Sequence, residues 1–163
     1  MAKVGFTAAV LKEVNTLFGR YPQKVHALLP LLHIVQREND GWLPRGWETY
    51  VAELCEVTVN HVRGVITFYN MYRDHPPGKY HIMVCTCVPC GLCGGMEILE
   101  HLEKRLAIHP GNTTADGLFS LEEAQCLAAC DQAPLMMVNE DMQFRITPEE
   151  IDRWIGEVRA KKA

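Results

Sequence analysis

Six of the seven cysteines stand in two short groups, and this distribution limits the folds open to the chain. The first group lies in the stretch VCTCVPCGLC and consists of Cys85, Cys87, Cys90 and Cys93. The second group is the pair Cys126 and Cys130. The first residues show no secretory signal, so we expect a cytoplasmic protein. In a reducing compartment, clustered cysteines more often bind metal or carry out redox chemistry than form structural disulfides.

Composition excludes some classes of protein. The 163 residues suffice for one ordinary domain or two small ones, and 48% are apolar, so a buried core needs no disulfides. The net charge of −4 argues against a nucleic-acid-binding protein, which usually carries a basic excess. No stretch approaches the roughly 18 consecutive apolar residues of a membrane span, so we expect no direct membrane insertion.

The first part of the chain has helical periodicity. Apolar residues at helical spacing predict four short helices, over 7–18, 25–35, 47–54 and 58–69, with Thr7 and Thr58 as candidate caps. Pro30 predicts that the second helix is kinked or begins late. The stretch RDHPPGK (73–79) predicts a break between helices, because it holds two prolines and a glycine. We therefore expect an N-terminal helical bundle over 1–76 and a second domain over 77–163.

The second part has an α/β pattern. We expect a strand over 79–85, an amphipathic helix with Leu92, Met96, Leu99, Leu102 and Leu106 on its apolar face, and a long loop over 109–121. Two strands, 133–139 and 142–146, read as a hairpin turning at Glu140-Asp141. A last helix begins at Thr147, where Pro148 and Glu150 complete a capping-box pattern. The domain is a small α/β sandwich with its cysteines in loops.

Two interpretations of the first cysteine group fit poorly. A c-type haem site needs Cys-x-x-Cys-His, but glycine follows both Cys90 and Cys93. A bacterial [4Fe–4S] ferredoxin motif matches the spacing of Cys87, Cys90 and Cys93. It then requires a cysteine where Glu97 stands.

Other interpretations fit the spacing. Cys90 and Cys93 form a Cys-x-x-Cys pair that would suit a thiol–disulfide oxidoreductase, although this leaves the second group unexplained. Cys85 with Cys90, and Cys126 with Cys130, form two separated pairs that suit a [2Fe–2S] cluster, each pair holding one iron. A plant-type variant would use Cys85, Cys90 and Cys93 with one cysteine of the second group, and zinc can also take four thiolates. Spacing alone leaves cluster and thiol chemistry open.

A resemblance favours the cluster. The stretches VCTCVPCGLCGG and ADGLFSLEEAQCLAACDQAPLMMVNE, with HVRGVITFYNMY and PGKYHI before them, resemble the thioredoxin-like [2Fe–2S] subunit (E subunit) of respiratory NADH:quinone oxidoreductase, complex I. NAD-linked hydrogenases and formate dehydrogenases share this type of subunit. The resemblance extends over residues 10–158. It implies a thioredoxin-like [2Fe–2S] ferredoxin domain preceded by an N-terminal helical bundle, and it carries the cluster ligands onto Cys85, Cys90, Cys126 and Cys130.

The same resemblance implies an electron-transfer subunit of an NADH dehydrogenase without a complete active site of its own. The chain has no G-x-G-x-x-G and no Walker motif, so we expect no NADH or flavin site in it. The resemblance implies that FMN and NAD belong to a partner subunit. Through that complex the protein would lie at the inner face of the cell membrane. The sequence departs from the family pattern at Cys87 and Cys93, where cysteine is not expected, and at Ala128, where glycine is usual. Cys87 and Cys93 are therefore expected beside the cluster without being ligands.

Overall fold

The computed structural model describes residues 4–161. The chain divides into two compact units, with the division between Pro76 and Pro77. Each unit has its own apolar core. Within the described residues, no helix combines the length and apolarity that a bilayer crossing requires.

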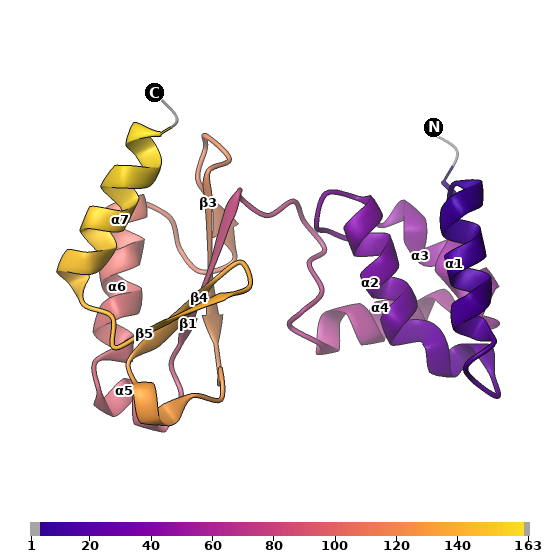
Figure 1. Ribbon diagram of the computed structural model, residues 1–163, viewed down its shortest axis with the longest axis horizontal. Coiled ribbons are helices and arrows are strands. Elements are labelled where there is room, and N and C mark those ends of the chain that lie inside the picture. Colours follow the sequence, from indigo (N-terminus) through magenta and orange to yellow (C-terminus); the bar gives the residue numbers. More distant parts are fainter. Residues whose placement is uncertain (1–3, 162–163) are drawn as a thin grey trace. The chain divides into compact units, whose positions relative to one another are not determined.

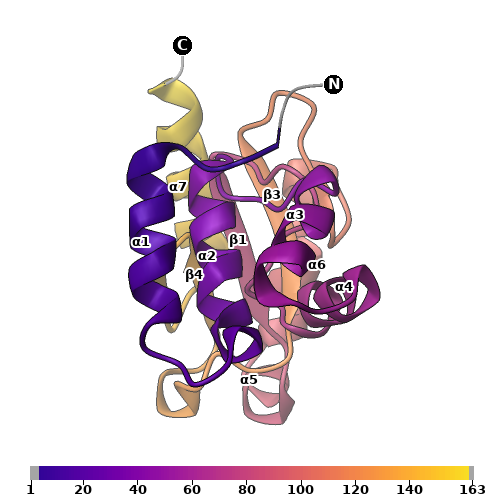
Figure 2. The ribbon, with the colours of Figure 1, turned by 90° about the vertical axis from the view of Figure 1, so that its right-hand side faces the viewer.

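In the described part of the N-terminal unit, helices are the regular secondary structure, and loops connect them (Figures 1 and 2). Its elements are α1 (Ala8–Phe18), the 3₁₀ turn η1 (Lys24–Ala27), α2 (Leu28–Glu38), α3 (Gly46–Cys55) and α4 (Val59–Phe68). The predicted caps are confirmed, since the Thr7 hydroxyl accepts from the N–H of Val10 and the Thr58 hydroxyl from that of His61. The second helix begins late, so that Pro30 falls in its first turn, where a missing N–H costs little.

The C-terminal unit is a five-stranded sheet in the order β2-β3-β1-β4-β5. The strands are β1 (Tyr80–Cys85), β2 (Asn112–Thr113), β3 (Phe119–Ala124), β4 (Leu135–Val138) and β5 (Asp141–Phe144). β1 and β3 run parallel, whereas β4 runs antiparallel to β1. The predicted α/β class is confirmed. The expectation of an unstructured loop over 109–121 is wrong, because β2 and the start of β3 occupy it.

Helices cover one face of this sheet (Figure 1). They are α6 (Gly95–Leu106) and α7 (Pro148–Ala160), and a one-and-a-half-turn helix, α5 (Val88–Leu92), precedes them. The core between sheet and helices includes Leu102, Phe119 and Ile155, none of which is more than 1% exposed. Burying each such side chain contributes about 1.5–3 kcal/mol.

The apolar face predicted for the helix after the cysteines is partly wrong. Leu92 belongs to the separate helix α5 and is 84% exposed, and Met96 is 46% exposed. The predicted Leu99, Leu102 and Leu106 are confirmed on the buried face of α6, and Ile98 is buried with them. The break between α5 and α6 falls at Gly94, whose φ of +95° ends the helical path. Because of this break, Leu92 is out of helical register with the buried residues of α6.

The capping box at α7 is confirmed and gives a first testable prediction. The Thr147 hydroxyl accepts from the N–H of Glu150 at 3.3 Å, and the Glu150 carboxylate accepts from the N–H of Thr147 at 3.1 Å. Replacing Thr147 by Ala removes the first bond, so α7 should lose about 1 kcal/mol of stability. Hydrogen exchange of the first-turn amides of α7 should accelerate accordingly. Thr16→Ala, which removes a hydroxyl from inside helix α1, is the control and should leave α7 exchange unchanged.

Candidate metal centre

Three strand ends meet at one edge of the sheet. β1 and β3 are parallel and in register from Tyr80 opposite Phe119 to Cys85 opposite Ala124, so both strands end there. β4 is antiparallel to β1 and begins at the same edge, at Leu135. The first cysteine group follows β1, and the second lies between β3 and β4. The topology therefore brings the two cysteine groups to one place, next to α5 (Figure 1).

The loop after β1 is held by hydrogen bonds to β3. The N–H of Thr86 donates to the carbonyl of Ala124 at 3.0 Å, and the Thr86 hydroxyl donates to the Glu123 carboxylate at 2.7 Å. α5 then begins directly after Cys87, and the N–H of Gly91 donates to the Cys87 carbonyl at 2.8 Å. The first cysteine group is thus a short, hydrogen-bonded helical loop.

Gly95 is the point where α6 approaches this loop most closely. A Cβ on Gly95 would lie 2.7 Å from the carbonyl oxygen of Cys85 and 2.8 Å from that of Cys90. Real Cβ atoms do not tolerate such distances to backbone, so the first residue of α6 has to be glycine in this arrangement. The start of α6 therefore packs directly on the backbone of both cysteines.

Cys85 and Cys90 form the buried part of the site. They are 1% and 0% exposed and pack with Leu135. Burial alone would raise the pKa of the Cys85 thiol. Hydrogen bonds from the backbone N–H groups of Cys87 and Leu127 outweigh burial and, with the Cys90 thiol, hold the pKa of Cys85 below its usual range. Burial, with the donated hydrogen bond to Cys85, raises the pKa of Cys90 to about 12.

The second pair is exposed. Cys126 stands on the loop after β3, Cys130 is the first residue of the 3₁₀ turn η2 (Cys130–Gln132), and both are exposed. The N–H of Ala128 donates to the sulfur of Cys126 at 3.3 Å. The backbone of this loop thus supplies a hydrogen-bond donor to one of the two exposed sulfurs.

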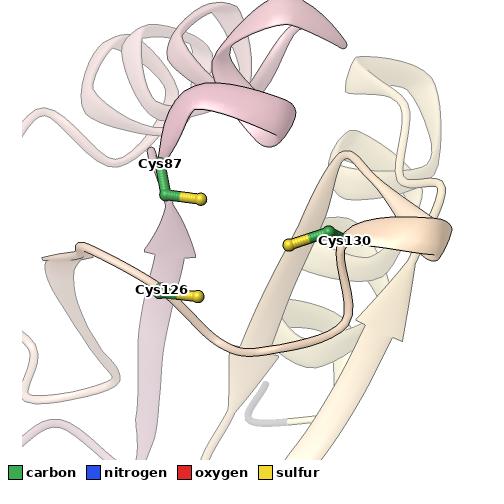
Figure 3. A group of neighbouring side chains, drawn as sticks. All are labelled: Cys87, Cys126 and Cys130. Atoms are coloured by element: carbon green, nitrogen blue, oxygen red, sulfur yellow. The ribbon is translucent and has the colours of Figure 1, made fainter.

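Cys87 joins the two pairs. Its sulfur and those of Cys126 and Cys130 all lie within 4.8 Å of one another, and the three side chains converge from two loops (Figure 3). Burial and the neighbouring Cys126 and Cys85 sulfurs raise the pKa of Cys87 to about 11. The sequence predicted Cys87 beside the cluster, but not the convergence of its sulfur with those of Cys126 and Cys130, because the direction of its side chain depends on where α5 begins. A Cys-x-Cys spacing at a strand end was the available signal.

The remaining cysteines lie elsewhere. Cys93 is exposed at the end of α5. Cys55 is 1% exposed in the N-terminal core, and burial raises its pKa to about 11 despite the lowering effect of Lys24. Cys55 is thus a small residue of the N-terminal core.

Ala128 adopts the backbone conformation that explains why glycine would suit this position. Its φ is +60°, a left-handed value that costs a non-glycine residue about 1–2 kcal/mol. Ala128→Gly removes this strain but adds the greater chain entropy of glycine in the unfolded state, about 0.5–1 kcal/mol. We expect the C-terminal unit to gain about 0.5 kcal/mol in urea unfolding of the cluster-free chain. The control, Ala129→Gly, should instead destabilise, because Ala129 already has a φ of −126°.

Comparison with known proteins identifies the family. The family model of the thioredoxin-like [2Fe-2S] ferredoxin matches residues 14–159. The chain therefore belongs to the thioredoxin-like [2Fe-2S] ferredoxin family, as its motifs predicted.

Its relatives are redox proteins by name. It is 42% identical to the E subunit of NADH-quinone oxidoreductase from Rickettsia felis, over 90% of this chain and 89% of that protein. It is 38% identical to the E subunit of the same enzyme from Mycobacterium tuberculosis, over 91% of this chain but 58% of the longer relative. Among solved structures, it resembles an NAD+-reducing [NiFe]-hydrogenase with 25% identity and a TM-score of 0.68. That match covers 82% of this chain and 23% of the hydrogenase chain.

Proposed function

We propose that this chain is an electron-transfer subunit that holds one [2Fe–2S] cluster through Cys85, Cys90, Cys126 and Cys130. The observation that carries the proposal is the convergence of two cysteine loops at one sheet edge, with backbone N–H groups directed at their sulfurs. The family match supports the type of cluster. When bound, the cluster would accept and release one electron at a time.

The donor groups fit such a cluster. Cys85 and Cys90 are hydrogen-bonded neighbours on one loop, and Cys126 and Cys130 share the other, so each loop would supply both thiolates for one iron. Hydrogen bonds reach three of these sulfurs from the backbone of Leu127, Ala128 and Leu135, among others. N–H donors of this kind stabilise the added charge of a reduced cluster and so raise its potential.

Exposure differs between the two sides of the site. Cys85 and Cys90 are buried, whereas Cys126 and Cys130 are exposed. The buried pair would hold its iron away from water, while the exposed pair would face a redox partner. This asymmetry suits electron exchange with another protein rather than with a small molecule enclosed in this chain.

The partner we propose is an FMN- and NADH-binding subunit of an NADH:quinone oxidoreductase. The names of the relatives support this parent complex, and the sequence itself carries no dinucleotide or nucleotide-phosphate motif. The chain would exchange one electron with the flavin. Its position at the inner face of the cell membrane would follow from the complex.

The thiol–disulfide alternative is less favoured. That chemistry needs an accessible cysteine with a lowered pKa. Cys90 is fully buried, and burial raises its pKa to about 12. The exposed Cys93 therefore has no accessible second cysteine in the Cys-x-x-Cys motif with which to form a disulfide. The Cys90 and Cys93 pair therefore lacks the activated nucleophile that the sequence interpretation required.

Adding NADH to the purified complex without oxygen tests the proposed function. We expect FMN to be reduced and a one-electron EPR signal to develop. In a complex carrying Cys126→Ser, NADH should still reduce FMN, but the signal from this cluster should be absent. Cys93→Ser is the matched control and should keep the signal. A chain that purifies without a flavin subunit, or a signal that survives Cys126→Ser unchanged, would contradict the proposal.

A further inference from the structure

The proposed cluster leaves one thiol of the site without a role. Cys87 is not among the four proposed ligands, yet its sulfur lies within 4.8 Å of both Cys126 and Cys130. It comes from the start of α5, whereas Cys126 and Cys130 come from the segment that leaves β3 and enters η2 (Figure 3). Three thiols converging from two loops form a donor set of their own.

We propose that Cys87, Cys126 and Cys130 form a second metal site, which binds a single soft divalent cation such as Zn²⁺ in the cluster-free chain. The site would exclude the cluster, because both need Cys126 and Cys130. This exclusion rests on the proposed function, whereas binding of the metal does not.

The distances suit zinc after a small movement. A zinc ion binds thiolates at about 2.3 Å in tetrahedral geometry, which places its sulfurs about 3.8 Å apart. The three sulfurs lie within 4.8 Å of one another, so a contraction of about 1 Å suffices. Cys126 lies on the loop that joins β3 to η2, and Cys130 is the first residue of η2, a 3₁₀ turn of three residues. A connecting segment of this kind can adjust more easily than a strand.

Access and chemistry also suit a single ion. Cys126 and Cys130 are exposed, so a metal ion can enter from solvent, and water can complete a fourth position. The N–H of Ala128 already donates to the Cys126 sulfur. Soft thiolate ligands select zinc over the hard cations Mg²⁺ and Ca²⁺.

Cys85 and Cys90 are not ligands of this second metal site. Both are buried, and they pair with each other under the start of α6. A metal ion that enters from solvent and binds the exposed thiols therefore does not reach Cys85 or Cys90. The second metal site thus shares Cys126 and Cys130 with the proposed cluster, and its third ligand is Cys87, which is not a proposed cluster ligand.

Titration of the reduced, cluster-free chain with Co²⁺ and then Zn²⁺ tests the metal site. We expect saturable binding of about one ion per chain, with a thiolate-to-cobalt charge-transfer band. X-ray absorption of the zinc-loaded chain should show about three sulfurs and one lighter atom. Four sulfurs around the zinc, or metal binding that does not saturate near one ion per chain, would overturn the proposal on the wild-type chain alone.

Cysteine variants provide the second readout. Cys87→Ser should weaken Co²⁺ binding roughly 100-fold, and Cys93→Ser should leave it unchanged. Circular dichroism confirms that each variant is folded, and Cys87→Ala serves if the serine variant is not. If Cys85→Ser weakens binding and Cys87→Ser does not, the ion uses the cluster ligands and the second site is disproved.

Competition separates this inference from the proposed function. One equivalent of Zn²⁺ should slow assembly of the cluster from iron and sulfide roughly tenfold in the wild type and hardly at all in Cys87→Ser. Equal slowing in both would overturn the role of Cys87. If Cys87→Ser assembles no cluster even without zinc, Cys87 is a cluster ligand, and the proposed ligand set fails instead.

Discussion

Serine in place of any one of Cys85, Cys90, Cys126 or Cys130 should abolish the stable [2Fe–2S] cluster. Each thiolate would supply half of the protein ligands of one iron, and serine lacks the soft sulfur donor. Visible absorption, iron and sulfide content should all fall to a small fraction of the wild type. These measurements are made on anaerobically purified chain.

The same scan contains its own controls. Cys93→Ser removes an exposed thiol from the same loop and should keep the full cluster. Cys87→Ser should also keep it, even though Cys87 lies close to the second pair. Loss of the cluster in Cys87→Ser together with its retention in Cys85→Ser would show that Cys87 takes the place of Cys85 as ligand.

Gly95→Ala should have the next largest effect, although residue 95 has no side chain to bind anything. The added methyl group would lie 2.7 Å and 2.8 Å from the carbonyl oxygens of Cys85 and Cys90. To accommodate it, the start of α6 or the cysteine loop has to move, at a cost of about 1–3 kcal/mol. Because the loop carries two proposed ligands, the cluster content per chain should fall with the stability of the C-terminal unit.

Gly91→Ala is the matched control for this substitution. Gly91 lies in the same loop, but a Cβ there would meet only the carbonyl oxygen of Thr86, at an ordinary 3.7 Å. This variant should assemble the cluster and unfold in urea as the wild type does. Equal cluster content in Gly95→Ala and Gly91→Ala would contradict the close packing of α6 on the cysteine loop.

Much of the helical structure could be predicted from the sequence. The N-terminal helices carry clear apolar periodicity, and Thr7, Thr58 and Thr147 stand where their hydroxyls cap a helix. These signals are local, because a cap and its partner N–H are only three residues apart. Local signals of this kind do not depend on the rest of the fold.

β3 could not be predicted from its pattern. Phe119, Ser120 and Leu121 are all buried, so the strand lacks the alternation that marks a half-exposed strand. The turn signals Pro-Gly and Asp-Gly before it favoured a loop. Its place beside β1 depends on parallel pairing, which is a long-range property of the chain.

The site was predicted in part. The spacing of the cysteines and the family resemblance indicated two groups sharing one centre, and the topology brings both groups to one sheet edge. The convergence of Cys87 on Cys126 and Cys130 was not predictable, because it follows from where α5 begins, directly after Cys87, and from the path of the second loop. The left-handed φ of Ala128 was foreseen only as a position that suits glycine.

The most direct test of a single [2Fe–2S] centre in this chain is its iron and sulfide content combined with quantitative EPR. Anaerobically purified chain should contain about two irons and two sulfides, and dithionite should produce about one unpaired electron per chain. Zinc without sulfide in the Cys87→Ser chain, which lacks the proposed second metal site, would identify a structural thiolate site instead. Colourless protein in which Cys93 reacts as one half of a disulfide-forming pair would identify thiol chemistry, and either result would contradict the proposed cluster.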